Sequence, residues 1–219
     1  EGGKGINVTV PFKVQAEAMA DESLEAANIC GAANCLNFAD GRIVADNFDG
    51  VGLVRDIEDN LCVELKGKRV LFAGAGGATR GALGPFLEAG VADICVANRT
   101  VEKARDVVHL LGPRGSLHAC GYDEIDHGFD VVLNATSASL TGQCPPLPPI
   151  AFEGAALAYE MVYGKGKTPF LKLAEDSGAD EIADGVGMLV EQAAEAFLWW
   201  RGKRPQTAAI IADLTVPLE

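Results

Sequence analysis

The sequence predicts an α/β protein, in which a doubly wound, Rossmann-like parallel sheet adjoins a partial second α/β domain that C-terminal helices complete. The first observation is that strand-length apolar runs alternate with helical stretches over 65–185, as in a parallel sheet covered on both faces. The second is a glycine-rich turn at 74–78, between a predicted strand and a predicted helix. The third is that the regular alternation of strands and helices is limited to this region: apolar residues are spaced differently before residue 51, and a helix is expected after residue 186. We therefore expect three parts, namely 1–49, 50–185 and 186–219.

Composition and charge limit the classes of protein to which this chain can belong. It has 219 residues, of which 48% are hydrophobic and 22% charged, as in an ordinary globular protein. No apolar run approaches the length of a membrane span, which needs about 18 residues. The net charge of -13 disfavours binding to nucleic acid or to anionic membranes. We expect small molecules as partners, and neither nucleic acid nor a membrane.

The six cysteines are widely spaced, and no CxxC pair occurs. This spacing disfavours a zinc site or a dithiol redox motif, so we expect no bound metal. Disulfides are associated with small secreted domains, whereas this chain is long enough for a large hydrophobic core. We therefore expect a reduced, cytoplasmic setting.

The first part of the chain has few regular elements. We expect a strand over 6–10, a helix over 14–27, and two further strands over 34–38 and 42–45. Asp40-Gly41, between the last two, is a strong signal for a two-residue hairpin. Two or three strands and one helix would leave exposed sheet edges. We therefore expect that an N-terminal portion is missing from this chain.

From residue 51 onward the spacing of apolar residues changes. A predicted helix that bridges two domains has its apolar face at Val51, Val54, Ile57 and Leu61. A helix over 101–111 is closed by Gly112-Pro113, a stop signal. The other expected elements before residue 186 are strands at 69–73, 94–97, 130–133, 155–162 and 181–183 and helices at 79–87 and 168–176. The last helix, 187–200, is expected to have its apolar side at Leu189, Ala193, Ala196, Phe197 and Trp200.

The glycine-rich turn predicts a dinucleotide site. It joins the strand at 69–73 to the helix at 79–87, an arrangement that brings backbone amides close to a pyrophosphate. Thr79 stands where a strict GxGxxG motif has its third glycine. The glycines that allow close approach are still present, at Gly74, Gly76 and Gly77.

The end of the next strand indicates which dinucleotide binds. An NAD site normally carries Asp or Glu about 20 residues after the turn, to hold the ribose 2′-hydroxyl. Here the strand at 94–97 ends in Asn98-Arg99-Thr100. A carboxylate would repel a 2′-phosphate, whereas a guanidinium can bind one through two hydrogen bonds. The sequence therefore predicts NADP as the cofactor.

Four polar side chains outside the turn are candidates for chemistry, and each has a plainer explanation. Lys13, just after Pro11, is an acid or base in a cleft, or a solvated surface lysine. Asp49 is its carboxylate partner, or it caps the following helix. Gln192 donates to a substrate hydroxyl, or is a partly buried side chain satisfied by backbone. Tyr163 lies at the edge of the cleft, or is a core tyrosine with a hydrated hydroxyl.

Taken together and in order, eight stretches resemble the shikimate dehydrogenase family over the full length of the chain. They are NVTVPFK, GAANCL, DNFDGVG, GAGGATRGA, ANRT, NATS, MVYGKGKTPF and ADGVGMLVEQA. The resemblance implies reversible, NADPH-linked reduction of 3-dehydroshikimate to shikimate, a step of chorismate and aromatic amino acid biosynthesis. It also makes 1–49 the partial substrate-binding and catalytic domain and 50–185 the NADP domain. The chain is expected as a monomer or homodimer.

The resemblance also implies roles for individual residues. The catalytic pair would be Lys13 and Asp49. The substrate would be bound by Thr9, Asn34, Asp49, Tyr163 and Gln192. The pyrophosphate would lie against Gly74, Ala75, Gly76, Gly77 and Ala78, and the 2′-phosphate against Asn98, Arg99, Thr100 and Lys103. The nicotinamide side would be lined by Thr136, Ser137, Met161 and Gly185.

Departures from the family pattern leave two alternatives. Phe48 and Cys35 stand where the family commonly has threonine, which removes a hydroxyl beside Asp49 and Asn34. The serine pair that binds the substrate carboxylate in the family would lie upstream of Glu1. The alternatives are a quinate/shikimate dehydrogenase of broader specificity and a non-catalytic NADP-binding fragment.

Overall fold

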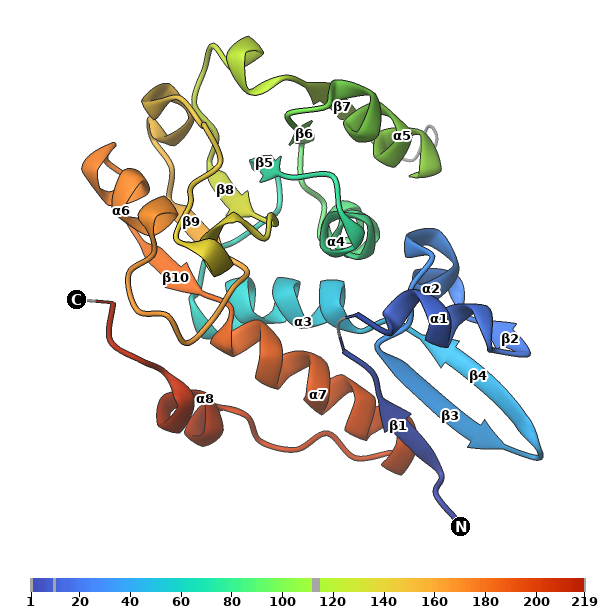
Figure 1. The fold of residues 1–219 in the computed structure, drawn as a ribbon. Coiled ribbons are helices and arrows are strands. Elements are labelled where there is room, and N and C mark those ends of the chain that lie inside the picture. The colour runs from blue at the N-terminus through green and yellow to red at the C-terminus, as the bar shows by residue number, and fades with distance from the viewer. Residues whose placement is uncertain (1, 10, 112–114, 219) are drawn as a thin grey trace.

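Two separate β-sheets organise the chain, as Figure 1 shows. The computed structural model describes residues 2–9, 11–111 and 115–218. Within these ranges one sheet has four strands in the order β1-β3-β4-β2, and the other has six parallel strands in the order β10-β9-β8-β5-β6-β7. Among the described helices, none has the length and apolar character needed to cross a membrane.

The smaller sheet contains the predicted hairpin. Its two strands pair antiparallel, and the turn between them has φ of 52° at Asp40 and 75° at Gly41. Positive φ at both central residues suits the twist of a two-residue hairpin. The strands of this sheet are β1 (Gly5–Asn7), β2 (Glu22–Ser23), β3 (Cys35–Ala39) and β4 (Arg42–Asp46).

The single helix expected over 14–27 is wrong. The structure has two short helices there instead, α1 (Lys13–Ala18) before β2 in the chain and α2 (Glu25–Cys30) after it. The backbone between them bonds to β4 instead of continuing the helix, since the amide of Asp21 donates to the carbonyl of Ile43 at 2.8 Å. Pairing with a neighbouring strand therefore overrides the local helical pattern.

The larger sheet confirms the five strands that the sequence predicts. They are β5 (Arg69–Ala73), β6 (Asp93–Ala97), β8 (Val131–Asn134), β9 (Leu157–Glu160) and β10 (Ile182–Asp184). The strand β7 (Leu117–Cys120), a short strand at the edge of the sheet, was not predicted. The strand order reverses between β5 and β8, and ligands of doubly wound sheets bind outside the carboxyl ends at such a point.

Helices cover both faces of the larger sheet. The α-helices of this part are α3 (Asp49–Arg55), α4 (Gly77–Glu88), α5 (Val101–Leu111), α6 (Pro169–Asp176), α7 (Val186–Arg201) and α8 (Ala208–Leu214). A π-helical turn, η1 (Asp56–Asn60), continues α3, and short 3₁₀ turns lie at η2 (Tyr122–Glu124), η3 (Ala138–Thr141) and η4 (Pro149–Phe152). The predicted stop at Gly112-Pro113 lies outside the described residues.

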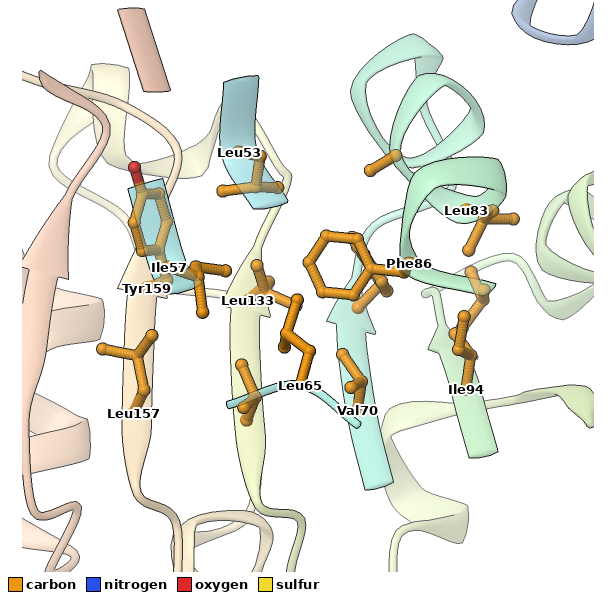
Figure 2. Close-up of a cluster of buried hydrophobic side chains, with 14 of the residues drawn as sticks. Leu53, Ile57, Leu65, Val70, Leu83, Phe86, Ile94, Leu133, Leu157 and Tyr159 are labelled. Atoms are coloured by element: carbon orange, nitrogen blue, oxygen red, sulfur yellow. The ribbon is translucent and has the colours of Figure 1, made fainter. Parts of the chain in front are cut away.

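Figure 2 shows the hydrophobic cluster on the face that α3, η1 and α4 cover. Leu53 and Ile57 come down from α3 and η1, and Phe86 from α4, onto side chains of the strands. All three are fully buried. This cluster joins the bridging helix to the sheet, so the position of α3 is set by the same core that holds the dinucleotide fold together.

Two predicted helix faces are rotated from the faces that the structure buries. In α3 and η1 the buried positions include Gly50, Gly52, Leu53 and Ile57, so three of the four predicted positions are only partly covered. In α7, Phe197 is 46% exposed, while Val186, Val190 and Ala194 are buried. Glycine and alanine carry a weak apolar signal in the sequence, yet they mark where helices approach most closely.

Gly50 marks the closest approach of α3 to α4. A Cβ atom on Gly50 would overlap the carbonyl oxygen of Gly81, which is backbone and cannot rotate away. Gly84, also in α4, has open space where its Cβ would lie. The two glycines therefore provide a matched pair for measuring the cost of this close packing.

We predict that Gly50→Ala lowers the free energy of unfolding by about 1–3 kcal/mol, the usual cost of overpacking. Gly84→Ala should raise it by about 0.5–1 kcal/mol, because alanine restricts the unfolded chain and favours helix. Urea unfolding of both variants checks this. Equal effects of the two substitutions would show that the α3–α4 contact is not tight.

A buried carboxyl lies beneath the first turn of α7. Asp56 accepts hydrogen bonds from the Tyr159 hydroxyl at 2.7 Å and from the Asn60 amide at 2.9 Å. The Tyr159 oxygen in turn accepts from the Met188 amide at 3.3 Å. The pKa of Asp56 is raised, because burial raises it more than the hydrogen bonds from Tyr159 and Asn60 lower it. Gly187 packs so closely on this carboxyl that a Cβ would overlap it.

This pKa shift predicts a pH dependence of stability. The folded protein binds the Asp56 proton more tightly than the unfolded chain does, so Asp56 stabilises the fold below its ordinary pKa of about 3.9. That contribution is lost as the pH rises through the folded pKa. The unfolding free energy of the wild type relative to Asp56→Asn should therefore fall as the pH rises above the ordinary pKa of about 3.9, by at most about 1.4 kcal/mol per unit, and level off above the raised folded pKa.

The matched control is Asp59→Asn, since Asp59 is 64% exposed in the same turn and pairs with Arg55 at 3.6 Å. Chemical denaturation at several pH values measures both variants. A difference between wild type and Asp56→Asn that stays constant with pH would contradict the prediction.

Candidate active site

A cavity of about 780 Å³ lies where the smaller sheet, the start of α3, the carboxyl edge of the larger sheet and α7 come together. It contains both residues of the predicted catalytic pair. Its described lining residues are Asn7, Val8, Thr9, Lys13, Asn34, Asp49, Ala78, Leu140, Met161, Val162, Tyr163, Gly185, Met188, Leu189 and Gln192. All five predicted substrate-binding residues are therefore in one cavity.

Lys13 and Asp49 form an ion pair in this cavity. The ammonium nitrogen lies 2.6 Å from Oδ2 of the carboxylate, and the two side chains are 25% and 14% exposed. Lys13 begins α1, and its carbonyl accepts the Ala33 amide at 2.9 Å, which fixes the helix start beside β3. The alternative of a solvated surface lysine is wrong, because half-buried Lys13 is held by a carboxylate from another element.

Asp49 is the first residue of α3, but its side chain makes no capping hydrogen bond there. The capping alternative is therefore wrong. Oδ1 of Asp49 accepts from Asn34 at 2.8 Å instead, while Oδ2 is bound by Lys13. The Asp49 amide donates to the side-chain oxygen of Asn47 at 3.0 Å, so the backbone is held as well. A carboxylate bound on both oxygens keeps one orientation toward the cavity.

Asn34 links the pair to α7. Its amide nitrogen donates to Asp49 and, at 3.0 Å, to Oε1 of Gln192, and its oxygen accepts the Phe48 amide at 2.9 Å. Gln192 donates to the Leu189 carbonyl at 2.8 Å, so this side chain is bound by backbone and also lines the cavity. The hydrogen-bonded row from Lys13 to Gln192 spans residues that are far apart in sequence.

Gly52 sets the distance between α3 and the Gln192 turn of α7. A Cβ on Gly52 would lie 2.6 Å from the Gln192 backbone nitrogen and 2.8 Å from its Cβ, both closer than real contacts. Figure 1 shows α3 and α7 running alongside each other. A glycine in α3 thereby determines where a polar side chain of α7 enters the cavity.

Tyr163 lies on the cavity wall with 48% of its surface exposed, so the core-tyrosine alternative is wrong. Thr9 is in the turn before α1, where its carbonyl accepts the Phe12 amide at 2.9 Å. The sequence reasoning missed Asn7, Val8, Leu140, Val162, Met188 and Leu189. The motif NVTVPFK and the helical row of Gln192 could have indicated Asn7 and Met188. Leu140 and Val162 carry no such signal.

The glycine-rich turn has the backbone that a pyrophosphate site needs. Gly74 has φ of 107°, and a Cβ there would lie 2.9 Å from the Thr136 methyl group. Gly76 precedes α4 and Gly77 begins it, and open space surrounds the Cβ positions of both. Thr79, in place of the third glycine, donates its hydroxyl to the Gly74 carbonyl at 2.7 Å and so closes the turn. The N-terminus of a twelve-residue helix is thus open to an anion.

The turn after β6 and the first turn of α5 present exposed basic groups. Asn98 binds the Thr100 carbonyl with its side chain at 2.8 Å, which shapes the turn, and its amide donates to the Cys120 carbonyl at 3.1 Å. Arg99 is exposed, and Lys103 is exposed one turn into α5. Of the residues predicted to contact the cofactor, Ala78, Met161 and Gly185 line the cavity, and the others lie outside it.

The two departures from the family pattern, Phe48 and Cys35, are packed against other parts of the protein. Phe48 packs edge-to-face on Trp199 with ring centroids 5.6 Å apart. Cys35 is fully buried, and burial raises the pKa of its thiol to about 12. Neither residue is part of the described cavity lining.

Comparisons with known proteins agree over all three parts of the chain. Three family models match: the shikimate dehydrogenase substrate binding domain over 1–36, shikimate / quinate 5-dehydrogenase over 56–141, and the shikimate 5'-dehydrogenase C-terminal domain over 185–214. A relative from Methylobacillus flagellatus named shikimate dehydrogenase (NADP(+)) is 53% identical, over 98% of this chain and 80% of its own length. The chain belongs to the shikimate dehydrogenase family.

Solved structures share the fold of this shikimate dehydrogenase family member. The Ael1 enzyme from Pseudomonas putida has a TM-score of 0.95 and 56% identity, covering 100% of this chain and 80% of that one. Shikimate 5-dehydrogenase from Thermus thermophilus, in complex with NADP(H) and shikimate, has a TM-score of 0.84 and 28% identity, covering 97% and 78%. The 5-ketofructose reductase of Gluconobacter, with a TM-score of 0.81 and 29% identity, covers 96% and 78%. The α/β class is thereby confirmed.

The exposed Arg99 gives a test of cofactor choice. We predict that Arg99→Ala weakens NADP binding by about 10- to 100-fold, the value of one or two hydrogen bonds to a charged group, and changes NAD binding by about twofold or less. Fluorescence titration measures both affinities.

The control is Arg105→Ala, because Arg105 is an exposed arginine of α5, the helix that follows Arg99, and it pairs with Glu102 at 3.6 Å. An equal loss of NAD and NADP affinity in Arg99→Ala would contradict a role in 2′-phosphate recognition.

Proposed function

We propose that this chain catalyses the reversible, NADPH-linked reduction of 3-dehydroshikimate to shikimate. The observation that carries the proposal is the Lys13–Asp49 pair, 2.6 Å apart in a cavity that continues to the first turn of α4 through Ala78. The relatives named shikimate dehydrogenase (NADP(+)) support it. The reaction belongs to chorismate and aromatic amino acid biosynthesis.

The residues present fit NADP. Gly74, Gly76 and Gly77 leave room for a pyrophosphate at the start of α4, and Arg99 is exposed for a 2′-phosphate. When bound, the cofactor supplies or accepts a hydride. We further assign Ala75, Ala78, Asn98, Thr100 and Lys103 to cofactor binding, together with Thr136, Ser137, Met161 and Gly185 on the nicotinamide side.

Lys13 acts on the oxygen of the substrate carbonyl. Negative charge develops on this oxygen during reduction, and an ammonium group stabilises that charge and can deliver the proton. Asp49 orients Lys13 and binds a neighbouring substrate hydroxyl, which is a positioning role. Gln192 presents its amide to a polyhydroxylated ring, Asn34 lines the same cavity while it holds Asp49 and Gln192, and Thr9 and Tyr163 are further polar lining residues.

We predict that Lys13→Ala lowers kcat by about 10²- to 10⁴-fold, the usual value of a general acid or base. NADP affinity should change by about twofold or less, because Gly74, Gly76 and Gly77 lie outside the cavity that Lys13 lines. Steady-state kinetics and NADP titration of the same preparation measure the two effects. Turnover that survives within a few-fold would show that Lys13 is not the catalytic acid.

A broader quinate/shikimate activity is the second candidate, since the family model over 56–141 carries both substrate names. Comparing kcat/KM for shikimate and quinate, each with NADP and NAD, decides between the two. A non-catalytic NADP-binding protein would show cofactor binding with turnover of neither substrate.

The substrate also carries a carboxylate that must be bound. Lys13 is the one cation among the described cavity residues, and it is assigned to the carbonyl oxygen, so the carboxylate needs another partner.

The proposal includes how the chain is divided and where it acts. Residues 1–49 form the substrate part, 50–185 the NADP part, and 186–219 return to the first, as Gln192 at the cavity supports. All six cysteines are free, which supports a reducing cytoplasm. We infer a monomer or homodimer.

A further inference from the structure

One buried carboxylate outside the catalytic pair joins several segments around the cavity. Glu160 is the last residue of β9 and is fully buried. Its Oε2 accepts hydrogen bonds from Asn134 at 2.9 Å, from Thr168 at 3.1 Å and from the Ser139 hydroxyl. Its Oε1 accepts the Val162 amide at 3.3 Å. Four donors from separate stretches of chain therefore meet on one side chain.

Two of these donors belong to segments that form the cavity wall. Ser139 is in η3, immediately before Leu140, and Val162 lies between Met161 and Tyr163. Leu140, Met161, Val162 and Tyr163 all line the cavity that holds Lys13 and Asp49. Glu160 itself is not part of the lining. Its carboxylate thus connects two parts of the wall from behind.

The other two donors tie this connection to the rest of the fold. Asn134 ends β8, and its side-chain oxygen accepts the amide of Thr136 at 3.1 Å and the hydroxyl of Thr136 at 2.7 Å. Thr168 caps α6 by accepting the Leu171 amide at 3.3 Å. The wall segments are therefore fixed relative to a central strand and a helix.

We propose that Glu160 is a positioning residue: its carboxylate holds the Leu140 segment and the 161–163 segment in the spacing that turnover requires. The inference rests on the proposed dehydrogenase function. An ionised carboxylate only accepts hydrogen bonds and has about four sites for them, so it suits four donors. A glutamine of the same shape must turn an NH₂ group toward at least one of these donors. The pKa of Glu160 is raised, because burial raises it more than the donors from Ser139, Asn134, Val162 and Thr168 lower it.

The test compares Glu160→Gln with Glu191→Gln. Glu191 is a matched control because it is also buried, at 2% exposed, but binds Arg204 and Asn60 away from the cavity. For Glu160→Gln we expect kcat to fall by about 10- to 100-fold, as for a misplacement of about 1 Å. Affinity for adenosine 2′,5′-bisphosphate, which lacks the nicotinamide half, should stay within about twofold. Glu191→Gln should lower the melting temperature while kcat stays within about twofold of wild type.

Two further variants keep the inference testable if Glu160→Gln folds poorly. Glu160→Asp retains the carboxylate and should recover part of the lost kcat, and Ser139→Ala should give a smaller loss because one donor is removed. A kcat within about twofold of wild type in both Glu160→Gln and Ser139→Ala would overturn the inference. So would a loss that follows the melting temperature equally in Glu160→Gln and Glu191→Gln.

Amide hydrogen exchange separates this inference from the proposed function. Glu160→Gln should exchange faster than wild type at 138–142 and 161–164, with the protection of 69–73 unchanged. A wild-type chain with no activity on shikimate would contradict the proposed function. The same exchange pattern would still support the inference that Glu160 holds the two wall segments in place. Unchanged exchange in the two wall segments would overturn the positioning role of Glu160, whatever the activity.

Discussion

The close approach of α3 to its neighbours is the constraint on which the rest of this structure depends. Gly50 lets α3 touch the backbone of α4, Gly52 lets it touch the backbone of α7 at Gln192, and Leu53 anchors it in the core of the larger sheet. The same helix begins with Asp49. The carboxylate of Asp49 and the amide of Gln192 are therefore placed by backbone contacts that allow little adjustment, because a protein core is close-packed.

Several polar groups around the cavity are held in place by hydrogen bonds to other polar groups. Asn34 serves both Asp49 and Gln192, and the carboxyl of Asp56 supports the start of α7 through the Tyr159 hydroxyl. Burying a carboxylate is costly unless donors surround it. Asp56 and Glu160 are buried carboxyl groups of this kind, and each supports a segment that lines the cavity. A fixed geometry there benefits a reaction that depends on the relative position of acid, substrate and cofactor.

The sequence predicted the larger sheet well and the smaller part less well. Strands β5, β6 and β8 each contain a continuous run of buried apolar residues, so the local signal and the tertiary environment agree. The segment at 14–27 has a helical pattern, but two of its residues pair with β4. The buried face of α7 was misplaced for a related reason, since alanine and glycine contacts leave no strong apolar period.

Motifs in the sequence predicted NADP as the cofactor, because the required chemistry restricts which residue types can stand after a strand or a turn, and the relatives named shikimate dehydrogenase (NADP(+)) agree. The resemblance to the family singled out Lys13 and Asp49 as the expected catalytic pair. Only the tertiary structure decided that Asp49 binds Lys13 and Asn34 instead of capping α3, and that Leu140 and Val162 belong to the wall. These contacts join residues from separate elements. Their distances depend on how helices and sheets pack, which no local pattern in the sequence encodes.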